Sequence, residues 1–263
     1  MLPESFWGRI QYLLQQYGTS FLSGAGNTMI IAIVGTFLGC LIGFIVGIIQ
    51  TIPVDQRDST VKKTLVGILK FIMACYVEFF RGTPMMVQAM FIYYGSAYLF
   101  NINMSMWFAA FFVVSINTGA YMAETVRGGI LSVDEGQTEG AKAIGMTHVQ
   151  TMINVILPQA LRNIMPQIGN NLIINIKDTC VLSIIGIVEL FYTTKGVAGA
   201  YYTYFEAFTI AMVMYFILTF VCSRLLRLLE HKMEGPQNYD LATTDTLTHT
   251  SGLYSYPKKK EEK

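Results

Sequence analysis

Residues 28–49 read TMIIAIVGTFLGCLIGFIVGII and contain no charged side chain. Charge-free windows are bounded by Arg9 and Asp55, by Arg81 and Glu124, and by Glu206 and Arg224. A helix that crosses a bilayer needs about 20 mostly apolar residues, and the first two windows are far longer. The chain is therefore predicted to be an all-α, polytopic membrane protein. A membrane barrel would instead show short alternating segments, which the sequence lacks.

The composition supports a lipid-embedded protein. Hydrophobic residues make up 53% of the 263 residues and charged residues 13%, whereas soluble domains carry about 25% charged residues. The net charge of +1 gives no reason to expect a nucleic-acid partner. No C-x-x-C pair occurs and the histidines lack ligand spacing, so neither a disulfide framework nor a metal site is expected; the cysteines are Cys40, Cys75, Cys180 and Cys222.

Glycines recur every four residues in the first predicted span, at Gly35, Gly39, Gly43 and Gly47. This spacing puts all four on one helix face. Small residues at such a face let another membrane helix approach closely, because packing drives association in lipid. We therefore expect a helix–helix contact there rather than a pore lining.

Basic residues indicate which loops are cytoplasmic. They follow the first span, flank or occupy the loop of about 132–162, and follow the last span; they are Arg57, Lys62, Lys63, Arg127, Lys142, Arg162, Arg224, Arg227, His231 and Lys232. This distribution predicts a cytoplasmic C-terminus and about five spans, with the N-terminus outside. Residues 107–125, 164–190 and 208–222 are predicted spans.

The segment 65–100 must then cross once, although Arg81-Gly82-Thr83-Pro84 interrupts it. Proline removes a backbone donor and disfavours helical geometry in the residue before it. We expect a broken helix, with an oblique half at 65–80 and a steep half at 85–99. Six spans, with a hairpin at the break, is the alternative.

The loop between the apolar segments contains GQTEGAKAIGMTHVQTMINVILPQALR at 136–162. Capping boxes are predicted to start two short helices, one at Ser132 and Glu135 and the other at Thr147 and Gln150. Gly145 lies between them, where a helix end favours left-handed geometry, and Pro158 is expected to end the second helix. Such a compact helix–glycine–helix element suits a docking surface for a soluble partner; an ordinary interfacial helix is the alternative.

Polar residues recur in the segment after this loop: Asn163, Gln167, Asn171 and Asn175, with Asn170 beside them and Lys177 and Asp178 beyond. At 3.6 residues per turn they form a drifting stripe. Polar groups at membrane depth are costly unless they face protein or water. We interpret the stripe as a solute path, with interhelical hydrogen bonding as the alternative.

Charged residues also occur around the Arg-Gly-Thr-Pro break, at Glu78, Arg81, Glu124 and Arg127. Glu78 and Arg81 are three residues apart, close enough to pair on one helix face. A structural ion pair near a cytoplasmic gate is favoured over contact with a solute.

Residues 1–230 are predicted to form the membrane domain, and residues 231–263 a polar, disordered cytoplasmic tail. The phosphate-binding pattern G-x-x-x-x-G-K-[ST] is absent, so the chain is not expected to be an enzyme that hydrolyses ATP by that route. Energy for transport would then come from a separate subunit.

Several motifs resemble those of the membrane-spanning permease subunit of bacterial ABC importers, in the polar amino-acid (histidine, glutamine or arginine) branch. In order, they are Phe80-Arg81-Gly82-Thr83-Pro84 with Gln88, Tyr121, Ala123-Glu124, Arg127-Gly128-Gly129-Ile130, Gly136-Gln137 with Glu139 and Ala141, Gly145, Leu157-Pro158-Gln159-Ala160-Leu161-Arg162 and Lys177-Asp178-Thr179. The resemblance covers residues 20–230. It implies a type I importer permease fold in a bacterial cytoplasmic membrane.

The resemblance also implies partners and roles. The loop would insert into an ATPase subunit, which binds ATP and Mg²⁺ while this chain binds no cofactor; the residues concerned are Glu139, Gly140, Ala141, Ala143, Gly145, Leu157 and Pro158. A second permease subunit, an external amino-acid-binding protein and a polar amino acid would complete the system. Gly140 departs from the family's alanine, and glycine costs a helix about 1 kcal/mol against alanine. An ion-coupled secondary transporter is the alternative function, followed by a channel or scaffold.

Overall fold

The computed structural model describes residues 2–54 and 59–234. Helices and short helical turns make up its regular structure, and no strand occurs in these two ranges. The elements are α1 (Phe6–Thr51), α2 (Thr60–Gly82), α3 (Met85–Phe100), α4 (Met106–Leu131), α5 (Glu135–Ala143), α6 (His148–Thr151), a π turn (Met152–Ile156), α7 (Leu157–Asp178), a 3₁₀ turn (Thr179–Ile185), α8 (Leu190–Tyr201) and α9 (Tyr204–Glu234). The all-α prediction is confirmed. Residues 231–234 of the predicted tail continue α9, contrary to the predicted disorder, and the rest of the tail lies outside the described residues.

Three of the described helices are long and apolar enough to cross a membrane: α1, α4 and α9. A fourth crossing is possible if 148–185 and α8, which meet at an angle of 56°, form one bent span. Five spans were predicted, and the one that is not among these candidates is residues 65–100. There α3 has only 16 residues, fewer than the roughly 20 that a crossing needs, and α2 carries several charged residues.

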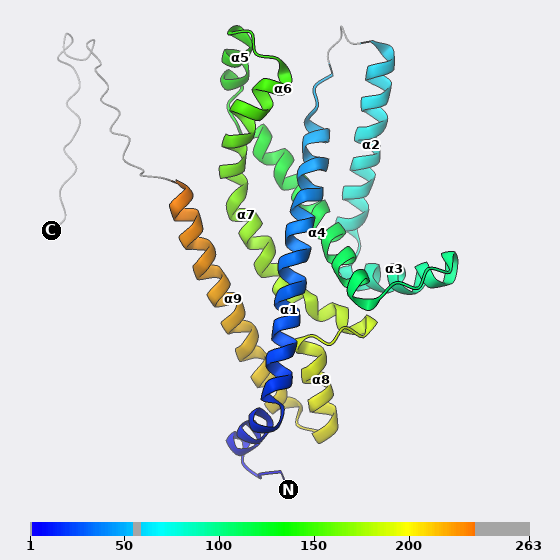
Figure 1. The fold of residues 1–263 in the computed structure, drawn as a ribbon, viewed down its shortest axis with the longest axis vertical. Coiled ribbons are helices and arrows are strands. Elements are labelled where there is room, and N and C mark those ends of the chain that lie inside the picture. Colours follow the sequence, from blue (N-terminus) through cyan, green and yellow to red (C-terminus); the bar gives the residue numbers. More distant parts are fainter. Residues whose placement is uncertain (1, 55–58, 235–263) are drawn as a thin grey trace, which may run out of the picture. The chain divides into compact units, whose positions relative to one another are not determined.

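The break predicted at Arg81–Pro84 is confirmed, because α2 ends at Gly82 and α3 begins at Met85. The predicted directions of the two halves are reversed. Figure 1 shows α2 running in the same general direction as α1, whereas α3 lies across them. The Tyr76 hydroxyl donates to the Ile116 carbonyl of α4 at 2.6 Å, which holds α2 along the bundle.

The packing of α1 against α4 forms the centre of the fold. A Cβ added to any glycine of the predicted face would come closer than 3.0 Å to a side chain of α4; the glycines are Gly35, Gly39, Gly43 and Gly47, and they face Val114, Thr118, Met122 and Val126 respectively. Both helices therefore contribute a four-residue repeat to the contact. The predicted close helix–helix approach is confirmed.

The end of the bundle near the N-terminus is tied by polar contacts that the sequence did not predict. Arg9 of α1 pairs with Glu206 of α9 at 3.1 Å. Glu189, which is fully buried, accepts hydrogen bonds from the backbone amides of Phe191 and Tyr192 in the first turn of α8 and from the Tyr215 hydroxyl of α9. α8 lies between the predicted spans 164–190 and 208–222, where no helix was predicted.

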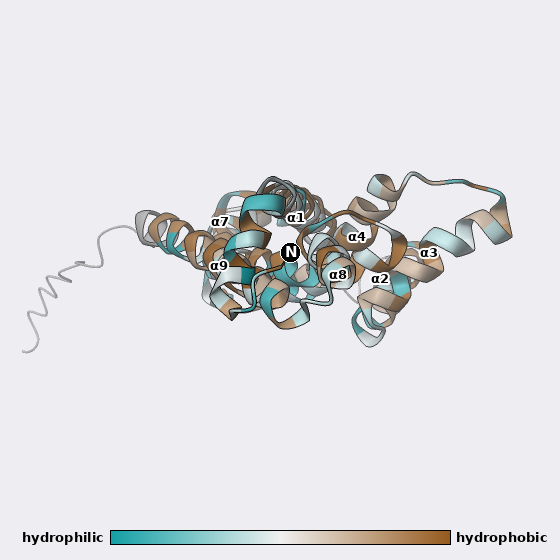
Figure 2. Ribbon diagram, turned by 90° about the horizontal axis from the view of Figure 1, so that it is seen from below, coloured by the Kyte–Doolittle hydropathy of each residue, from teal (hydrophilic) through white to brown (hydrophobic). Residues whose placement is uncertain are grey.

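Different short helices lie at the two ends of the bundle. In Figure 1, α5 and α6 lie at the end where α1 finishes and α2 starts, and α8 lies at the opposite end with the N-terminus. Viewed along the helices, hydrophobic residues are frequent on α3, α4 and α9, whereas α7 also carries hydrophilic residues (Figure 2). The lateral faces of the bundle are therefore suited to lipid.

A bulky residue on the glycine face of α1 should destabilise the protein. Gly43→Leu would place a side chain where Met122 packs, and overpacking of this kind costs roughly 1–3 kcal/mol. Gly26→Leu is the matched control, because nothing lies within 4 Å of a Cβ there. Thermal unfolding of the purified protein should show a lower midpoint for Gly43→Leu only; equal midpoints would contradict the packing account.

Candidate translocation cavity and coupling loop

A cavity of about 480 Å³ lies where the α2–α3 break meets α4 and α7, and we call it the central cavity. Its walls combine two charged residues with hydroxyl and amide groups. They are Arg81, Gly82, Thr83, Pro84, Met85, Asn117, Thr118, Tyr121, Asn171, Ile174, Asn175 and Asp178. Three segments that are distant in sequence thus converge on one polar space.

The polar stripe of α7 divides between packing and the cavity. Asn175 is buried, and its Nδ2 donates to Oγ1 of Thr36 at 2.7 Å and of Thr118 at 2.9 Å. One side chain therefore ties α7 to α1 and α4. Asn171 is also buried, and its Nδ2 donates to the Met122 Sδ of α4 at 3.3 Å and to the Gln167 carbonyl of its own helix at 3.0 Å. Both asparagines line the central cavity. The same side chains therefore make interhelical hydrogen bonds and face the predicted solute path.

The other members of the stripe are placed differently. Asn163 is exposed and donates to the Ser132 hydroxyl at 3.0 Å, near the loop. Gln167, Asn170 and Lys177 are exposed and do not line the central cavity. Asp178 does line it, at the last residue of α7. The structure therefore brings Asn171, Asn175 and Asp178 together and leaves the rest of the stripe outside.

Gln88 and Asn117 organise the helix break beside the cavity. The Gln88 Nε2 donates to the carbonyls of Phe80 and Thr83, each at 2.9 Å. Asn117 of α4 donates to the Gln88 Oε1 at 3.0 Å. These bonds satisfy carbonyls that the break would otherwise leave unpaired. Asn117 is a site residue that was not predicted, although a polar residue inside a charge-free window is a usable signal.

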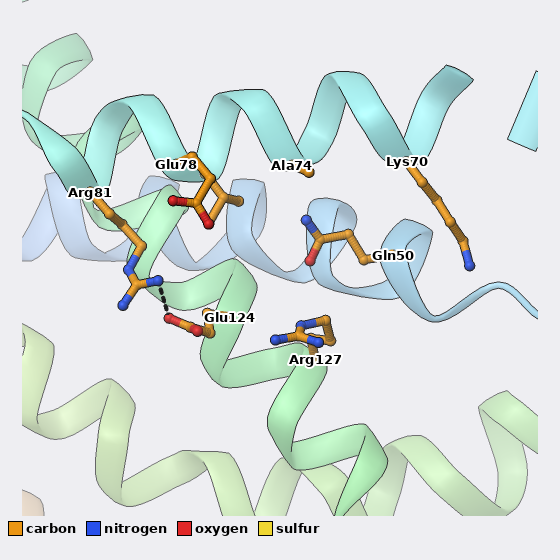
Figure 3. Close-up of a pocket in the computed structure, with 8 residues that line it drawn as sticks. Gln50, Lys70, Ala74, Glu78, Arg81, Glu124 and Arg127 are labelled. Atoms are coloured by element: carbon orange, nitrogen blue, oxygen red, sulfur yellow. Dashed lines mark ion pairs between the residues drawn. The ribbon is translucent and has the colours of Figure 1, made fainter. Parts of the chain in front are cut away.

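A second cavity, of about 290 Å³, is lined by the predicted gate residues, and we call it the charged cavity. Its walls are Gln50, Lys70, Ala74, Val77, Glu78, Arg81, Glu124 and Arg127 (Figure 3). Arg81 pairs with Glu124 of α4, and the predicted pair with Glu78 is wrong. The physical reason is that α2 and α4 pack together, so an interhelical partner outcompetes the one three residues away.

The loop forms two helices, but its first start signal lies two residues later than predicted. Asp134, not Ser132, caps α5 by accepting from the Gly136 amide at 2.8 Å. The Ser132 hydroxyl instead donates to the Gly129 carbonyl at the end of α4. The capping box of Thr147 and Gln150 is confirmed at the start of α6.

Gly145 lies between the two loop helices with a φ of +85°, as predicted. This is the left-handed region of backbone conformation, which residues with a Cβ adopt only at a cost in conformational energy. Its amide donates to the Lys142 carbonyl at 3.0 Å and closes the end of α5. The turn between α5 and α6 therefore depends on glycine at this position.

The prediction that Pro158 ends the second helix is wrong. Pro158 lies in the first turn of α7, where proline is tolerated because its missing donor is not needed. A π turn precedes it, in which the Leu157 amide donates to the Met152 carbonyl. Helical structure therefore continues from His148 to Asp178. The loop and the central cavity are joined by this one run.

The predicted coupling residues lie mostly at the surface. Glu139, Gly140, Ala143 and Gly145 are exposed, whereas Ala141 is buried. Nothing lies within 4 Å of a Cβ placed on Gly140. Large apolar side chains are exposed nearby, including Ile144 at 80%. Exposed apolar groups of this kind are typical of a protein-interaction surface.

Comparison with known proteins gives the family. The family model "Binding-protein-dependent transport system inner membrane component" matches residues 64–235. The glutamine transport system permease protein GlnP of Escherichia coli (strain K12) is 35% identical over 214 residues, which cover 81% of this chain and 92% of that protein. The nopaline transport system permease protein NocM of Agrobacterium fabrum (strain C58 / ATCC 33970) is 34% identical and covers 84% and 90%.

Solved structures agree with the sequence comparison. A crystal structure of an amino acid ABC transporter with histidines contains a chain that is 34% identical, with a TM-score of 0.72 and coverage of 83% of this chain and 96% of the other. The MetNI methionine ABC transporter, in an inward-facing conformation, is 19% identical with a TM-score of 0.65, and shows the same fold. The family model, the sequence identity to these relatives and the fold agree over most of the chain. The chain therefore belongs to the family of inner-membrane components of binding-protein-dependent transport systems.

Proposed function

We propose that the chain is the permease subunit of an ABC importer for a polar amino acid. The observation that carries the proposal is the continuous helical run from His148 to Asp178. It joins the exposed helix–glycine–helix element to the wall of the central cavity. A displacement of the loop by a partner would therefore be transmitted to the cavity along this helical run.

The ATPase partners would supply the force. In this proposal, two ATPase subunits hold ATP and Mg²⁺ and receive the exposed surface around Glu139–Gly145 in their clefts. A second permease subunit, identical or homologous, completes the pathway, and an external binding protein delivers the solute. The names of the relatives support this assembly, because the family is defined by dependence on a binding protein.

The proposed orientation places α5 and α6 in the cytoplasm of a bacterium and the N-terminus outside. Basic residues near the ends of the predicted spans support it through the positive-inside rule. The fold is compatible, since α5 and α6 lie at the opposite end from the N-terminus (Figure 1). The C-terminus would then be cytoplasmic as well.

The chemistry of the central cavity supports a zwitterionic solute. Arg81 offers a donor for a carboxylate, and Asp178 offers an acceptor for an ammonium group. A volume of about 480 Å³ is within the usual range for a small-molecule site. The relatives named for glutamine and nopaline transport support the same solute class. The comparisons give no support to the ion-coupled secondary transporter.

Replacing Gly145 should uncouple transport. Gly145→Val forces a branched side chain into the left-handed region, at a cost of about 1–2 kcal/mol or more, and should abolish uptake in reconstituted vesicles while membrane insertion persists. Gly140→Ala is the comparison, because alanine fits the open space and favours the helix by about 1 kcal/mol. It should keep uptake at or above the unmodified level. Normal uptake by Gly145→Val would contradict the coupling role.

Removing the charge of Asp178 should impair transport without unfolding the protein. A lost charge-assisted hydrogen bond is worth about 1.5–3 kcal/mol, so Asp178→Asn should lower uptake about tenfold or more. Lys177→Gln is the matched control, because the neighbouring Lys177 is exposed and lies outside the cavity. Initial rates of labelled amino-acid uptake would test both variants, and equal losses would exclude a specific role for the cavity wall.

A further inference from the structure

The central and charged cavities are stacked along the same two helices. On α2 and the break, the charged cavity takes positions 70–81 and the central cavity positions 81–85. On α4, the charged cavity takes positions 124 and 127 and the central cavity positions 117–121. On both helices, the residues that line the charged cavity give way to those that line the central cavity at the level of Arg81. Among the residues that the structure describes, Arg81 alone lines both spaces.

The level of this boundary is occupied by three side chains in contact. The Arg81 guanidinium pairs with the Glu124 carboxylate across the gap between α2 and α4 (Figure 3). On its other side it lies 5.5 Å from the centroid of the Tyr121 ring, a cation–π distance. Tyr121 belongs to the central cavity and Glu124 to the charged cavity. Arg81 contacts both side chains, so its guanidinium lies at the boundary of the two spaces.

The charged cavity lies on the side of this boundary that faces the loop. Its residue Gln50 is next to the last residue of α1, and Arg127 lies in the last turns of α4. Lys70 lies near the middle of α2, between the start of that helix and Arg81. All three of these helix ends are at the end of the bundle that holds α5 and α6 (Figure 1). A solute leaving the central cavity in that direction meets Arg81 and Glu124 first.

We propose that the Arg81–Glu124 pair is a removable partition between the central cavity and a charged exit vestibule. This inference rests on the proposed transport of a zwitterionic solute. The two side chains are 35% and 43% exposed, and half-exposed ion pairs are weak enough to open reversibly. A zwitterion is the class of solute that offers each partner a replacement, a carboxylate for Arg81 and an ammonium group for Glu124.

The charged cavity, which is the proposed exit vestibule, can hold such a solute after the Arg81–Glu124 pair opens. Besides the pair itself, it presents Lys70, Glu78 and Arg127. Glu78 makes no ion pair within 2–54 and 59–234, and neither does Arg127. Charges of both signs are therefore available beyond the partition. Removing Glu124 should leave the two cavities connected at rest.

Cysteine accessibility tests the partition directly. Ile174→Cys places a thiol in the wall of the central cavity, in a background where Cys40, Cys75, Cys180 and Cys222 are replaced. Inside-out membrane vesicles that contain the assembled transporter, without ATP, are treated with an impermeant trimethylammonium thiosulfonate reagent. We expect slow labelling with the intact pair and at least tenfold faster labelling with Glu124→Gln. The double variant Arg81→Glu/Glu124→Arg, which restores a pair of opposite charges, should label slowly again.

Glu78→Gln is the matched control, because it removes a carboxylate from the same vestibule without touching the pair. Its labelling rate should equal that of the intact protein. Unchanged labelling with Glu124→Gln, or equal acceleration with Glu78→Gln, would overturn the partition. Co-purification of each variant with the ATPase partner identifies failures of assembly, and the double variant reports on the pair if a single variant does not assemble.

The test separates the partition from the proposed function, because labelling requires no transport. If the intact system takes up amino acid but Glu124→Gln labels slowly, the partition alone is wrong. If labelling follows the expected pattern but the intact system accumulates no amino acid, the proposed function is wrong and the partition stands.

Discussion

The close approach of α1 and α4 is the contact on which the rest of the structure depends. In a bilayer the lipid tails are as apolar as the side chains, so helices associate through packing and hydrogen bonds. Four glycines remove the side chains that would separate α1 from α4. The gap is narrow enough for Thr36 of α1 and Thr118 of α4 to share one partner, Asn175 of α7. Backbone proximity therefore determines where a third helix attaches.

The central cavity follows from this arrangement. One face of α4 is filled by the glycine face of α1, and adjacent positions carry Asn117 and Tyr121 toward the helix break. The break itself exposes backbone carbonyls, which Gln88 and Asn117 satisfy by hydrogen bonds. A polar space can persist among apolar helices because its buried groups have partners. The cavity therefore exists because the helix stays broken here and side chains, not helical backbone, satisfy the free carbonyls.

The loop acts on the cavity through α7. A π turn at Met152–Ile156 lets Pro158 enter the helix without ending it, and the asparagine contacts fix the far part of α7 to the bundle centre. Packed helices respond to force by moving between discrete arrangements, because their cores are dense. The ion pair between α2 and α4 lies at the boundary of the two cavities. It is therefore a point where a small relative shift of helices changes the connection between spaces.

Several features could be predicted from the amino-acid sequence: the class of protein, the glycine face, the break at Arg81–Pro84, the capping box at Thr147 and the glycine turn at Gly145. These features depend on local chemistry: charge-free length, spacing on one helix, or the conformational preference of a single residue. Other features could not be predicted without the fold. They are the pairing of Arg81 with Glu124, the placement of Asn171, Asn175 and Asp178 but not Lys177 at the cavity, and the position of Pro158 inside a continuous helix. Those outcomes depend on which helices become neighbours and how they are rotated, and a pattern of 3.6 residues per turn places a side chain on a face without saying what that face meets.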